Sequence, residues 1–284
     1  MTVLVTGATG TVGRQLVQQL LAAGHQVRAL TRDPEHADLP AEVEVVRGDT
    51  TDARSLRPAF AGVTAAHLIN FGNTYRPLPN GPEIVAEAQA AGVRRVTILG
   101  GWKEGTLEPA VRASDLEWTH VRPGEFMFNT LPDWGPPLRD GDVIREPHAD
   151  RPSTPVHEAD IAAVAAVALT EDGHHGRTYP LTGPETISPR VKLRLLAEAT
   201  GRDLRFEELT PDQARALWTE RPPALRLFGV APGGPAEKAE YVINRYANIP
   251  PEGRATTDTV ERVTGRPARS YAQWATENAD RFRC

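Results

Sequence analysis

The chain has 284 residues, of which 40% are hydrophobic and 24% are charged. This length and composition suit a folded protein with a substantial core, and they exclude a disordered chain, a collagen-like fibre and a coiled coil. The formal net charge of −5 argues against general nucleic-acid binding, which usually goes with a basic balance.

The first half of the chain alternates short apolar runs with helical patterns. Residues 11–23 carry apolar side chains at the 3.6-residue spacing of a helix that packs on one face, and Gly24 ends the pattern. Asp52 or Thr51 is expected to cap the short helix that follows. Strands are predicted at 2–6, 26–31, 43–47, 65–70, 95–99 and 118–121, and helices at 11–23, 52–60, 82–91 and 107–114. This alternation predicts an α/β fold with a Rossmann-type, doubly wound parallel sheet.

The pattern changes after Pro123. Residues 132–155 are rich in Pro, Gly and Asp and are predicted to form a loop with room for one hairpin. The proline-rich residues 222–235 are predicted to be a mobile, lid-like stretch. Helices are predicted at 159–169, 189–199, 211–218, 236–246 and 271–280, with strands at 178–181 and 204–209. This half is expected to form mainly a smaller lobe.

Several kinds of segment and site are not expected. No run of about 18 apolar residues predicts a membrane span, and the first ten residues lack the basic and apolar regions of a signal peptide. The one cysteine, Cys284, allows no intrachain disulfide and no structural zinc site on thiolates. We therefore expect a cytoplasmic protein without a metal site.

The strongest motif is a glycine-rich turn between the first strand and the first helix. Gly7 permits a tight turn, Gly10 lets a pyrophosphate approach the backbone, and Gly13 lets the helix pack closely on the strand. The helix N-terminus then offers N–H groups and a partial positive charge to phosphates. The predicted dinucleotide-binding residues here are Gly7, Thr9, Gly10, Thr11, Val12 and Gly13.

The residues that follow the second strand distinguish two dinucleotides. A carboxylate there would bind the ribose hydroxyls of NAD, whereas a cation would bind the 2′-phosphate of NADP. Arg32 is placed for that phosphate, although Asp33 would oppose it and Arg32 has the alternative of a solvated charge. Asp49, after the third strand, is expected either to hold the adenine amino group or to cap a helix. NADP(H) is favoured over NAD(H).

Motifs along nearly the whole chain resemble the NmrA-like branch of the short-chain dehydrogenase/reductase superfamily. They are TGATGTVG at 6–13, ALTRDP at 29–34, GDTTD at 48–52, AGVRRV at 91–96, RASDLEWTHVRPGEF at 112–126, PVHEADIAAVAAVAL at 155–169 and YPLTGPETIS at 179–188. The resemblance implies a Rossmann fold with NADP(H) over the strand ends and with Pro123 and Gly124 near the nicotinamide. It also implies an NADP-binding core at 1–130 and, at 131–284, mainly a substrate-binding lobe, with segments around 155–182 returning to the core.

The catalytic residues of the wider superfamily have no full counterpart. Its reductases usually carry a Tyr and a Lys four residues later, where the Lys lowers the tyrosine pKa. None of the five tyrosines has a lysine at that spacing. Lys103 falls close to the family's lysine and is a candidate to hold the nicotinamide ribose, with a surface ion pair as its alternative. Tyr75 is a candidate proton donor, with loop packing as its alternative.

Further residues are placed around the predicted pocket. Asn70 and Phe71 end the fourth strand and are expected to face the cofactor ribose and nicotinamide. The predicted substrate-binding residues are Trp102, Glu125, Phe126, Met127, Asn129 and Trp134, the tryptophans by stacking on a planar ligand or by packing instead in the core or lid. The expected partner is a small molecule, and the chain is expected to be a monomer or homodimer.

Three functions are compatible with these residues. The first is an NADPH-dependent reductase that transfers hydride to a planar or aromatic small molecule such as a quinone, an enone or a biosynthetic intermediate. The second is an NADP(H)-sensing regulator that performs no chemistry, since the resembled family includes such members. The third is a non-redox enzyme, such as a cyclase, dehydratase or epimerase, that reuses the same pocket. The glycine motif and Arg32 favour the first.

Overall fold

The chain forms two compact units in a computed structural model that describes residues 1–72, 76–101 and 104–282. Unit 1 consists of Met1–Pro123, Glu158–Leu181 and Thr259–Arg266. Unit 2 consists of Gly124–His157, Thr182–Asp258 and Pro267–Cys284. Each unit is therefore built from three stretches of chain.

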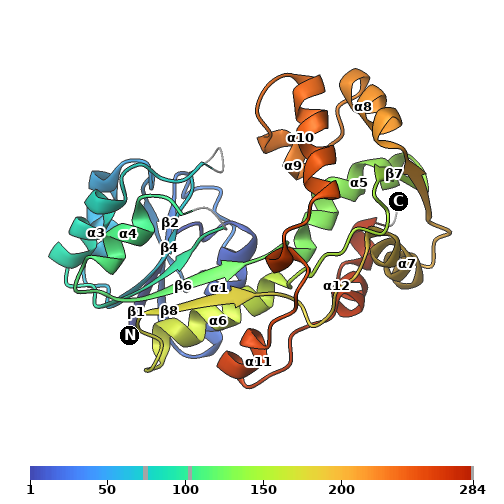
Figure 1. The fold of residues 1–284 in the computed structure, drawn as a ribbon. Coiled ribbons are helices and arrows are strands. Elements are labelled where there is room, and N and C mark those ends of the chain that lie inside the picture. The colour runs from blue at the N-terminus through green and yellow to red at the C-terminus, as the bar shows by residue number, and fades with distance from the viewer. Residues whose placement is uncertain (73–75, 102–103, 283–284) are drawn as a thin grey trace. The chain divides into compact units, whose positions relative to one another are not determined.

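Unit 1 contains a seven-stranded parallel sheet in the order β3-β2-β1-β4-β5-β6-β8 (Figure 1). The order reverses between β1 and β4, and this is the switch point beside which open α/β sheets bind ligands. The strands are β1 (Thr2–Val5), β2 (Gln26–Thr31), β3 (Glu44–Arg47), β4 (Ala65–Ile69), β5 (Arg95–Leu99), β6 (Glu117–Pro123) and β8 (Arg177–Leu181). Every pair of neighbours is parallel, so all carboxyl ends lie along one edge.

Helices cover both faces of this sheet. On one face α1 (Thr11–Ala22) packs against α6 (Glu158–Thr170), which also contacts β4, β5 and β6. The apolar side chains of α6 are buried almost all round, as expected of a helix enclosed by protein. The remaining elements are η1 (Ala53–Leu56), α2 (Arg57–Phe60), α3 (Gly81–Ala90), α4 (Leu107–Arg112) and, beside α6 and β8, α11 (Thr259–Thr264).

An apolar cluster of unit 1 lies between the sheet and the helices α2, α3 and α4. Leu4 and Leu68 reach it from the sheet, Phe60 from α2, Ile84 from α3 and Leu107 from α4. All five side chains are at most 2% exposed. Burial of this set holds the strand ends of the sheet in fixed positions.

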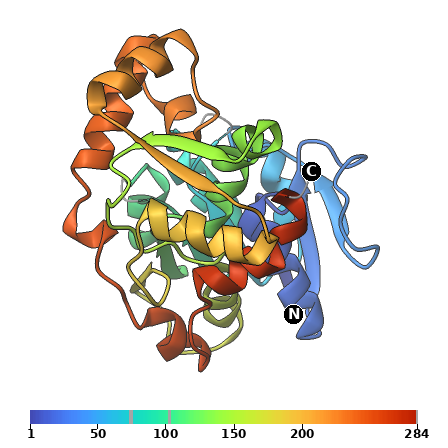
Figure 2. The same cartoon turned by 90° about the vertical axis from the view of Figure 1, so that its right-hand side faces the viewer.

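Unit 2 combines a two-stranded parallel sheet with two groups of helices (Figure 2). In the first group, Trp134, Leu193 and Trp274 share one apolar core, in which α7 packs against α12. In the second, α8 packs against α10 and α9 contacts α10. The elements are η2 (Met127–Asn129), α5 (Thr130–Asp140), β7 (Val143–Pro147), α7 (Pro189–Thr200), β9 (Arg205–Leu209), α8 (Pro211–Glu220), α9 (Arg226–Val230), α10 (Pro235–Ala247), η3 (Pro251–Gly253), α12 (Tyr271–Glu277) and η4 (Ala279–Phe282).

The predicted α/β class and its doubly wound parallel sheet are confirmed. The predicted bounds of the second and fifth strands match β2 and β5, and the other strands and unsplit helices of the first half differ by at most two residues at either end. Asp52 caps η1 as expected, since its carboxylate accepts from the Arg54 N–H at 3.1 Å. The predicted helix at 52–60 is split into η1 and α2, with Pro58 near the start of α2.

The prediction of a loop at 132–155 is wrong. Helix α5 covers Thr130–Asp140 although Pro136 and Pro137 lie inside it, and β7 pairs in parallel with β9 rather than in a hairpin. Trp134 and Leu138, one helical turn apart, are at most 5% exposed in the core of unit 2. Burial of this face outweighs the poor helix propensity of the two prolines.

The prediction of a lid-like stretch at 222–235 is also wrong. The segment contains α9, and Leu225 and Phe228 are at most 5% exposed. Both belong to an apolar cluster with Trp218 of α8 and Val242 of α10, and the rings of Trp218 and Phe228 meet edge to face. The prolines therefore end α8 and begin a packed connection.

Among the helices of the described residues, none is long and apolar enough to cross a membrane.

Candidate functional site

The turn between β1 and α1 brings two stretches of backbone into close contact. Gly7 has a φ of +63°, a left-handed conformation that favours glycine, and its carbonyl accepts from the Gly10 N–H at 2.9 Å. A Cβ on Gly13 would lie 2.1 Å from the Gly7 oxygen. A side chain at position 13 is therefore incompatible with this packing of α1 on the turn.

The first turn of α1 presents its N–H groups without a competing anion. Gly10 is the N-cap, so no side chain can accept from these donors, and the first turn contains no acidic residue. The donors and the helix dipole therefore form a place for an anionic group. Thr11, Val12 and Gly13 begin the helix, and the side chain of Val12 is buried.

A cavity of about 360 Å³ opens at the carboxyl ends of the central strands of unit 1. Six residues predicted to bind a dinucleotide line it, namely Gly7, Thr9, Gly10, Arg32, Asp49 and Phe71. The other lining residues are Leu30, Thr31, Gly48, Thr50, Ile69 and Gly72. Of this second group, Thr31 and Gly72 were also expected near the cofactor, whereas Leu30 and Ile69, which lie at the ends of β2 and β4, were not predicted.

The residues after β2 leave a cation facing this cavity. Within the described ranges, the exposed Arg32 side chain makes no hydrogen bond or ion pair. The Asp33 carboxylate instead lies 2.8 Å from Nδ1 of His36, and Asp33 does not line the cavity. Arg32 is therefore available to an anion, while its acidic neighbour is turned to a local partner.

Asp49 has a structural role as well as a place in the cavity. Its Oδ1 accepts from the N–H and the hydroxyl of Thr51, at 2.9 and 2.8 Å. The bond from the Thr51 N–H is the main reason why the pKa of Asp49 lies below its usual value, and the charge of Arg32 adds to this effect. Asp49 thus stays ionised and shapes the loop in addition to lining the cavity.

A cluster of buried polar side chains lies under the end of β5. Nδ2 of Asn70 donates to Oε1 of Glu108, and Oε2 of Glu108 accepts from the Gly105 N–H at 2.9 Å. Nε2 of His120 is 4.0 Å from Glu108 Oε1 and has no hydrogen-bond partner in the described part of the chain. All three side chains are at most 3% exposed. Burial lowers the pKa of His120, which favours the neutral ring.

Gly100 packs directly against this cluster. A Cβ at position 100 would lie 2.7 Å from Asn70 Nδ2, 2.8 Å from His120 Nε2 and 2.9 Å from Glu108 Oε1. The polar cluster thus occupies the space that a side chain at this strand end would need. Asn70 was expected to face the cofactor, and the structure directs its amide to Glu108; contact with a cofactor remains a prediction for it.

The other predicted site residues lie at the end of β6 and in unit 2. Pro123 is buried at the end of β6, opposite Leu181, and Gly124 is the first residue of unit 2. Met127 and Trp134 belong to the core of unit 2. Phe126 forms an isolated bridge with Val156, and Asn129 Oδ1 accepts from Arg226 Nη1 at 3.1 Å. Contact of Pro123 and Gly124 with the cofactor, and of the other four residues with a substrate, remains a prediction.

Charged side chains form two groups in unit 2. Trp134 Nε1 donates to Glu146 at 2.6 Å, and Glu146 also accepts from Arg151 Nη2 at 2.7 Å. Lys192 pairs with Glu125, which was predicted to bind the substrate. Glu146 and Lys192 are at most 5% exposed, so the first group joins α5 to β7 and the second joins α7 to the segment before η2 with few solvated charges.

Tyr75, Lys103 and Trp102 lie outside the described residues, so the two catalytic predictions and one substrate prediction stand as they were made. Within the described ranges, no three His, Cys, Asp or Glu side chains are grouped as a metal site would require.

The cavity of unit 1 fits a dinucleotide. The turn has glycines where a Cβ would clash, so its backbone is open to a pyrophosphate. The N–H groups at the start of α1 point to the place that this pyrophosphate would take. Arg32 lies at the strand end where a ribose 2′-phosphate is bound in this type of fold.

Comparison with known proteins agrees with this geometry. A family model described as NAD(P)H-binding matches residues 7–172, which include the glycine turn, Arg32 and the polar cluster under Gly100. The chain belongs to this NAD(P)H-binding family. The resemblance to NmrA-like proteins is confirmed, and a crystal structure of a mutant NmrA has a TM-score of 0.72 at 20% identity, over 97% of this chain and 94% of that one.

Two relatives match this chain along almost its whole length. A (4-alkanoyl-5-oxo-2,5-dihydrofuran-3-yl)methyl phosphate reductase from Streptomyces griseus is 39% identical over 99% of each chain. An NAD(P)H azoreductase from Xenophilus azovorans is 32% identical over 99% of each chain. The structure of the NADPH-dependent quinone oxidoreductase of Escherichia coli in complex with NADPH has a TM-score of 0.77 at 22% identity, over 97% of this chain and 99% of that one, and so shares the fold.

Replacing Gly100, which packs against the polar cluster, should destabilise the protein. Gly100→Ser places a side chain within 2.9 Å of Asn70, His120 and Glu108, so we expect a loss of about 1 to 3 kcal/mol in the free energy of unfolding. Urea unfolding measures it. Gly101→Ser is the matched control, since a Cβ on Gly101 would meet nothing within 4 Å. Equal stability of the two variants would contradict this packing.

The stability of unit 2 should depend on the ionisation of Asp133. Burial raises the pKa of Asp133 from its ordinary value of about 4 to about 7, against the opposing hydrogen bond from the Arg226 N–H. A carboxyl with a raised folded pKa costs stability as the pH rises from about 4 to 7, and the cost then stays constant. Asp133→Asn keeps an acceptor for Arg226 and should remove this loss, on the order of 4 kcal/mol.

Urea unfolding of the wild type and of Asp133→Asn across that pH range measures the difference. The two proteins should be closest in stability near pH 4, and the variant should be the more stable one at pH 7. A difference that does not change between these two pH values would show that Asp133 has an ordinary pKa.

Proposed function

We propose that this chain is an NADPH-dependent reductase that transfers hydride to an electron-poor double bond in a planar small molecule, of which a conjugated enone is the best example. The observation that carries the proposal is the cavity of unit 1, where the glycine turn meets Arg32, which has no hydrogen-bond or ion-pair partner among the described residues, at the sheet's switch point. The full-length relatives support the reaction class, because both are named as reductases.

The preference for NADPH follows from the side chains after β2. Arg32 can bind a 2′-phosphate with two N–H groups, while the Asp33 carboxylate, which would repel that phosphate, is held by His36. The N–H groups of the α1 N-terminus would hold the pyrophosphate, and Asp49 and Thr50 lie where they can contact the adenosine. When bound, the cofactor supplies the hydride.

The substrate class follows from what the chain contains and from the relatives. The name of the Streptomyces griseus relative describes a dihydrofuran ring whose double bond is conjugated with carbonyl groups, and the other relative acts on azo compounds. Both bonds accept a hydride at one end and a proton at the other. Such a reduction depends more on orientation and on stabilising the developing negative charge than on a Tyr–Lys pair, which this sequence does not have.

The protein's part in the reaction is to hold the acceptor and to handle one proton. Lys103 remains our candidate to bind the nicotinamide ribose and Tyr75 our candidate proton donor. Gly100 and its polar cluster take the place of the serine that is often found at this strand end. We therefore infer that the carbonyl oxygen of the substrate is stabilised by groups other than a serine hydroxyl.

The reductase proposal is tested by following NADPH oxidation with three acceptors, an α-acyl butenolide, a benzoquinone and an azo dye. We expect the butenolide to be reduced by NADPH, and faster by NADPH than by NADH. Binding of NADPH without oxidation by any of the three would favour a regulator that senses the cofactor. Product formation from a candidate substrate without added cofactor would favour a non-redox enzyme.

The cofactor preference should depend on Arg32. Arg32→Gln is expected to weaken NADPH binding about ten- to hundredfold, roughly 1.4 to 2.8 kcal/mol, with little change for NADH, because only NADPH carries the 2′-phosphate. Fluorescence titration with each cofactor measures it. Arg47→Gln is the matched control, since Arg47 is also exposed at the end of a strand but does not line the cavity. Equal losses for both cofactors would contradict the assignment.

A further inference from the structure

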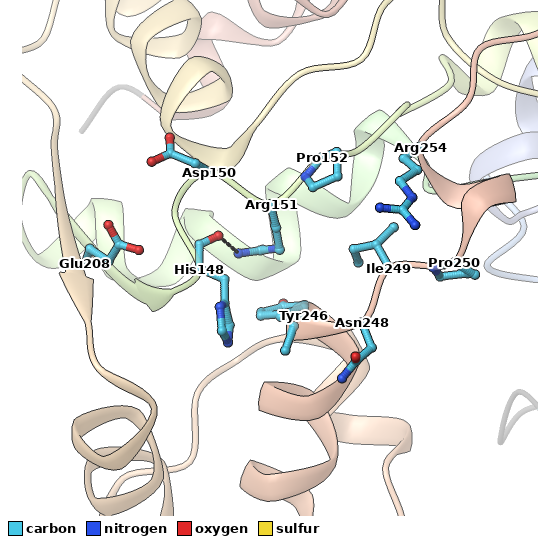
Figure 3. Close-up of a pocket in the computed structure, with 11 residues that line it drawn as sticks. His148, Asp150, Arg151, Pro152, Glu208, Tyr246, Asn248, Ile249, Pro250 and Arg254 are labelled. Atoms are coloured by element: carbon cyan, nitrogen blue, oxygen red, sulfur yellow. Dashed lines mark hydrogen bonds between the residues drawn. The ribbon is translucent and has the colours of Figure 1, made fainter.

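Unit 2 has a cavity of its own, with a volume of about 700 Å³ (Figure 3). Its walls come from the segment after β7, from the end of β9 and from the chain that leaves α10. The lining residues are His148, Asp150, Arg151, Pro152, Glu208, Tyr246, Ala247, Asn248, Ile249, Pro250 and Arg254. All belong to unit 2, and none of them takes part in the cavity of unit 1.

The acidic side chains of this cavity already have a cation. Arg190 Nε lies 3.2 Å from Asp150 Oδ1, and Arg190 Nη2 lies 3.0 Å from Glu208 Oε2. The other Glu208 oxygen accepts from the Ala149 N–H at 3.1 Å. One arginine and one backbone group thus satisfy the acidic side of the cavity, which does not call for a cationic ligand.

Arg151 is held in a fixed position on the cavity wall. Its Nη2 donates to Glu146 at 2.7 Å and its Nη1 to the Pro147 carbonyl at 3.2 Å. The guanidinium carbon lies 3.6 Å from the centre of the Tyr246 ring. These contacts leave the Nε–H of Arg151 without an acceptor among the described residues.

Arg254 supplies a charge that the protein does not use. It is exposed, and its guanidinium forms no hydrogen bond or ion pair within the part of the chain that the structure describes. Figure 3 shows the Arg254 side chain directed toward Ile249, on the side away from Asp150 and Glu208. The free cation and the neutralised carboxylates therefore lie at opposite ends of the cavity.

His148 adds a third unused group and a sign of local strain. Its φ is 57°, a left-handed conformation that is uncommon for a residue with a side chain. The Arg151 N–H donates to its carbonyl at 3.1 Å, which helps to hold this conformation. Its Nε2 is buried and has no partner in the described residues. Strain of this kind tends to occur at sites where a side chain must be aimed.

We propose that this cavity binds a small molecule through a phosphate monoester. The groups left unused by Arg254 and Arg151 are hydrogen-bond donors, and Arg254 carries a positive charge, so the ligand must offer several acceptor oxygens and negative charge. A phosphate monoester offers three such oxygens. The volume of about 700 Å³ exceeds what a free phosphate needs and leaves room for the organic part of the ligand.

This site goes beyond the proposed reductase function, because it is built entirely from unit 2 and its occupation requires no hydride transfer. Its ligand can be the phosphorylated form of the compound that is reduced or a phosphate ester that is not reduced. Both share the same recognised group, and the kinetic experiment below distinguishes them.

Calorimetric titration of the full chain with benzyl phosphate tests the site, with benzyl alcohol and inorganic phosphate as comparison ligands. Saturating NADP⁺ is present throughout, so that a phosphate does not report on Arg32. Benzyl phosphate should bind more tightly than inorganic phosphate, and benzyl alcohol should not bind measurably. Arg254→Gln should weaken benzyl phosphate binding at least tenfold. Arg245→Gln, an exposed arginine on α10 that does not line the cavity, should leave it unchanged.

Each other outcome overturns a stated part of the proposal. Equal affinities of the two variants would remove Arg254 from any phosphate site, and inorganic phosphate binding as tightly as the ester would exclude a monoester ligand. If NADP⁺ fails to bind, the reductase proposal fails, while the difference between Arg254→Gln and Arg245→Gln still tests this site. His148→Gln, which keeps a side-chain donor and changes no charge, should retain most of the affinity.

Steady-state kinetics on two butenolides, one with a phosphate ester and one without, distinguish whether the phosphate belongs to the reduced compound or to a separate ligand. If the phosphate belongs to the reduced compound, Arg254→Gln raises KM for the ester alone and leaves kcat unchanged. If it belongs to a separate ligand, KM for both butenolides is unaffected and benzyl phosphate binding still depends on Arg254.

Discussion

The close approach of α1 to the β1–α1 turn is the constraint on which the cofactor cavity depends. With Gly13 packed where a Cβ would meet the Gly7 carbonyl at 2.1 Å, the helix starts directly behind the end of β1. Its first N–H groups therefore reach the switch point of the sheet, where β1 and β4 are neighbours and the strand order reverses. The ends of β2 and β3 then contribute Arg32 and Asp49 to the same cavity. A small shift of α1 would separate these groups from the helix dipole.

A second constraint lies under the end of β5. Asn70, Glu108 and His120 come from β4's end, α4 and β6, and they converge so closely that only a glycine fits at position 100. Three buried polar groups thus occupy the space that a side chain at this strand end would need. The neutral His120 and the hydrogen-bonded Glu108 are buried too deeply to meet a substrate, so we interpret the cluster as support for the strand ends. This agrees with a reaction that depends on orientation more than on a dedicated acid.

The sequence predicts unit 1 well because its signals are local. Apolar spacing, glycines at turns and the capping Asp52 each act within a few residues, and the parallel sheet follows from their alternation. The prediction fails at α5 because Pro136 and Pro137 are local signals, whereas the burial of Trp134 and Leu138 is a property of the whole unit. It fails at 222–235 for the same reason, since Phe228 gains its partners from α8 and α10.

The cofactor site follows the same division. Gly7, Gly10 and Arg32 are recognisable because the motif requires them at fixed distances along the chain, while Leu30 and Ile69 line the cavity only because strand pairing brings the ends of β2 and β4 beside the turn. Glu125 and Trp134 follow the Pro123–Gly124 motif and were assigned to the substrate. The structure joins them to Lys192 and Glu146, partners at least twelve residues away that no local pattern indicates. The placement of an acidic residue near a motif therefore does not determine whether it meets a ligand or an internal cation.

The same reasoning separates functional from structural arginines in this acidic chain. Arg151 and Arg190 form ion pairs with carboxylates, so their charges are already compensated within the protein. Arg32 and Arg254 each line a cavity, and the carboxylates near them have other hydrogen-bond or ion-pair partners, Asp33 in His36, Asp49 in Thr51 and Glu208 in Arg190. A guanidinium without an ion-pair partner among the described residues stays solvated at little cost in free energy. It forms a charge-assisted hydrogen bond when a phosphate binds. The pairing of the neighbouring carboxylates, rather than the number of arginines, is what makes these two positions suited to anionic ligands.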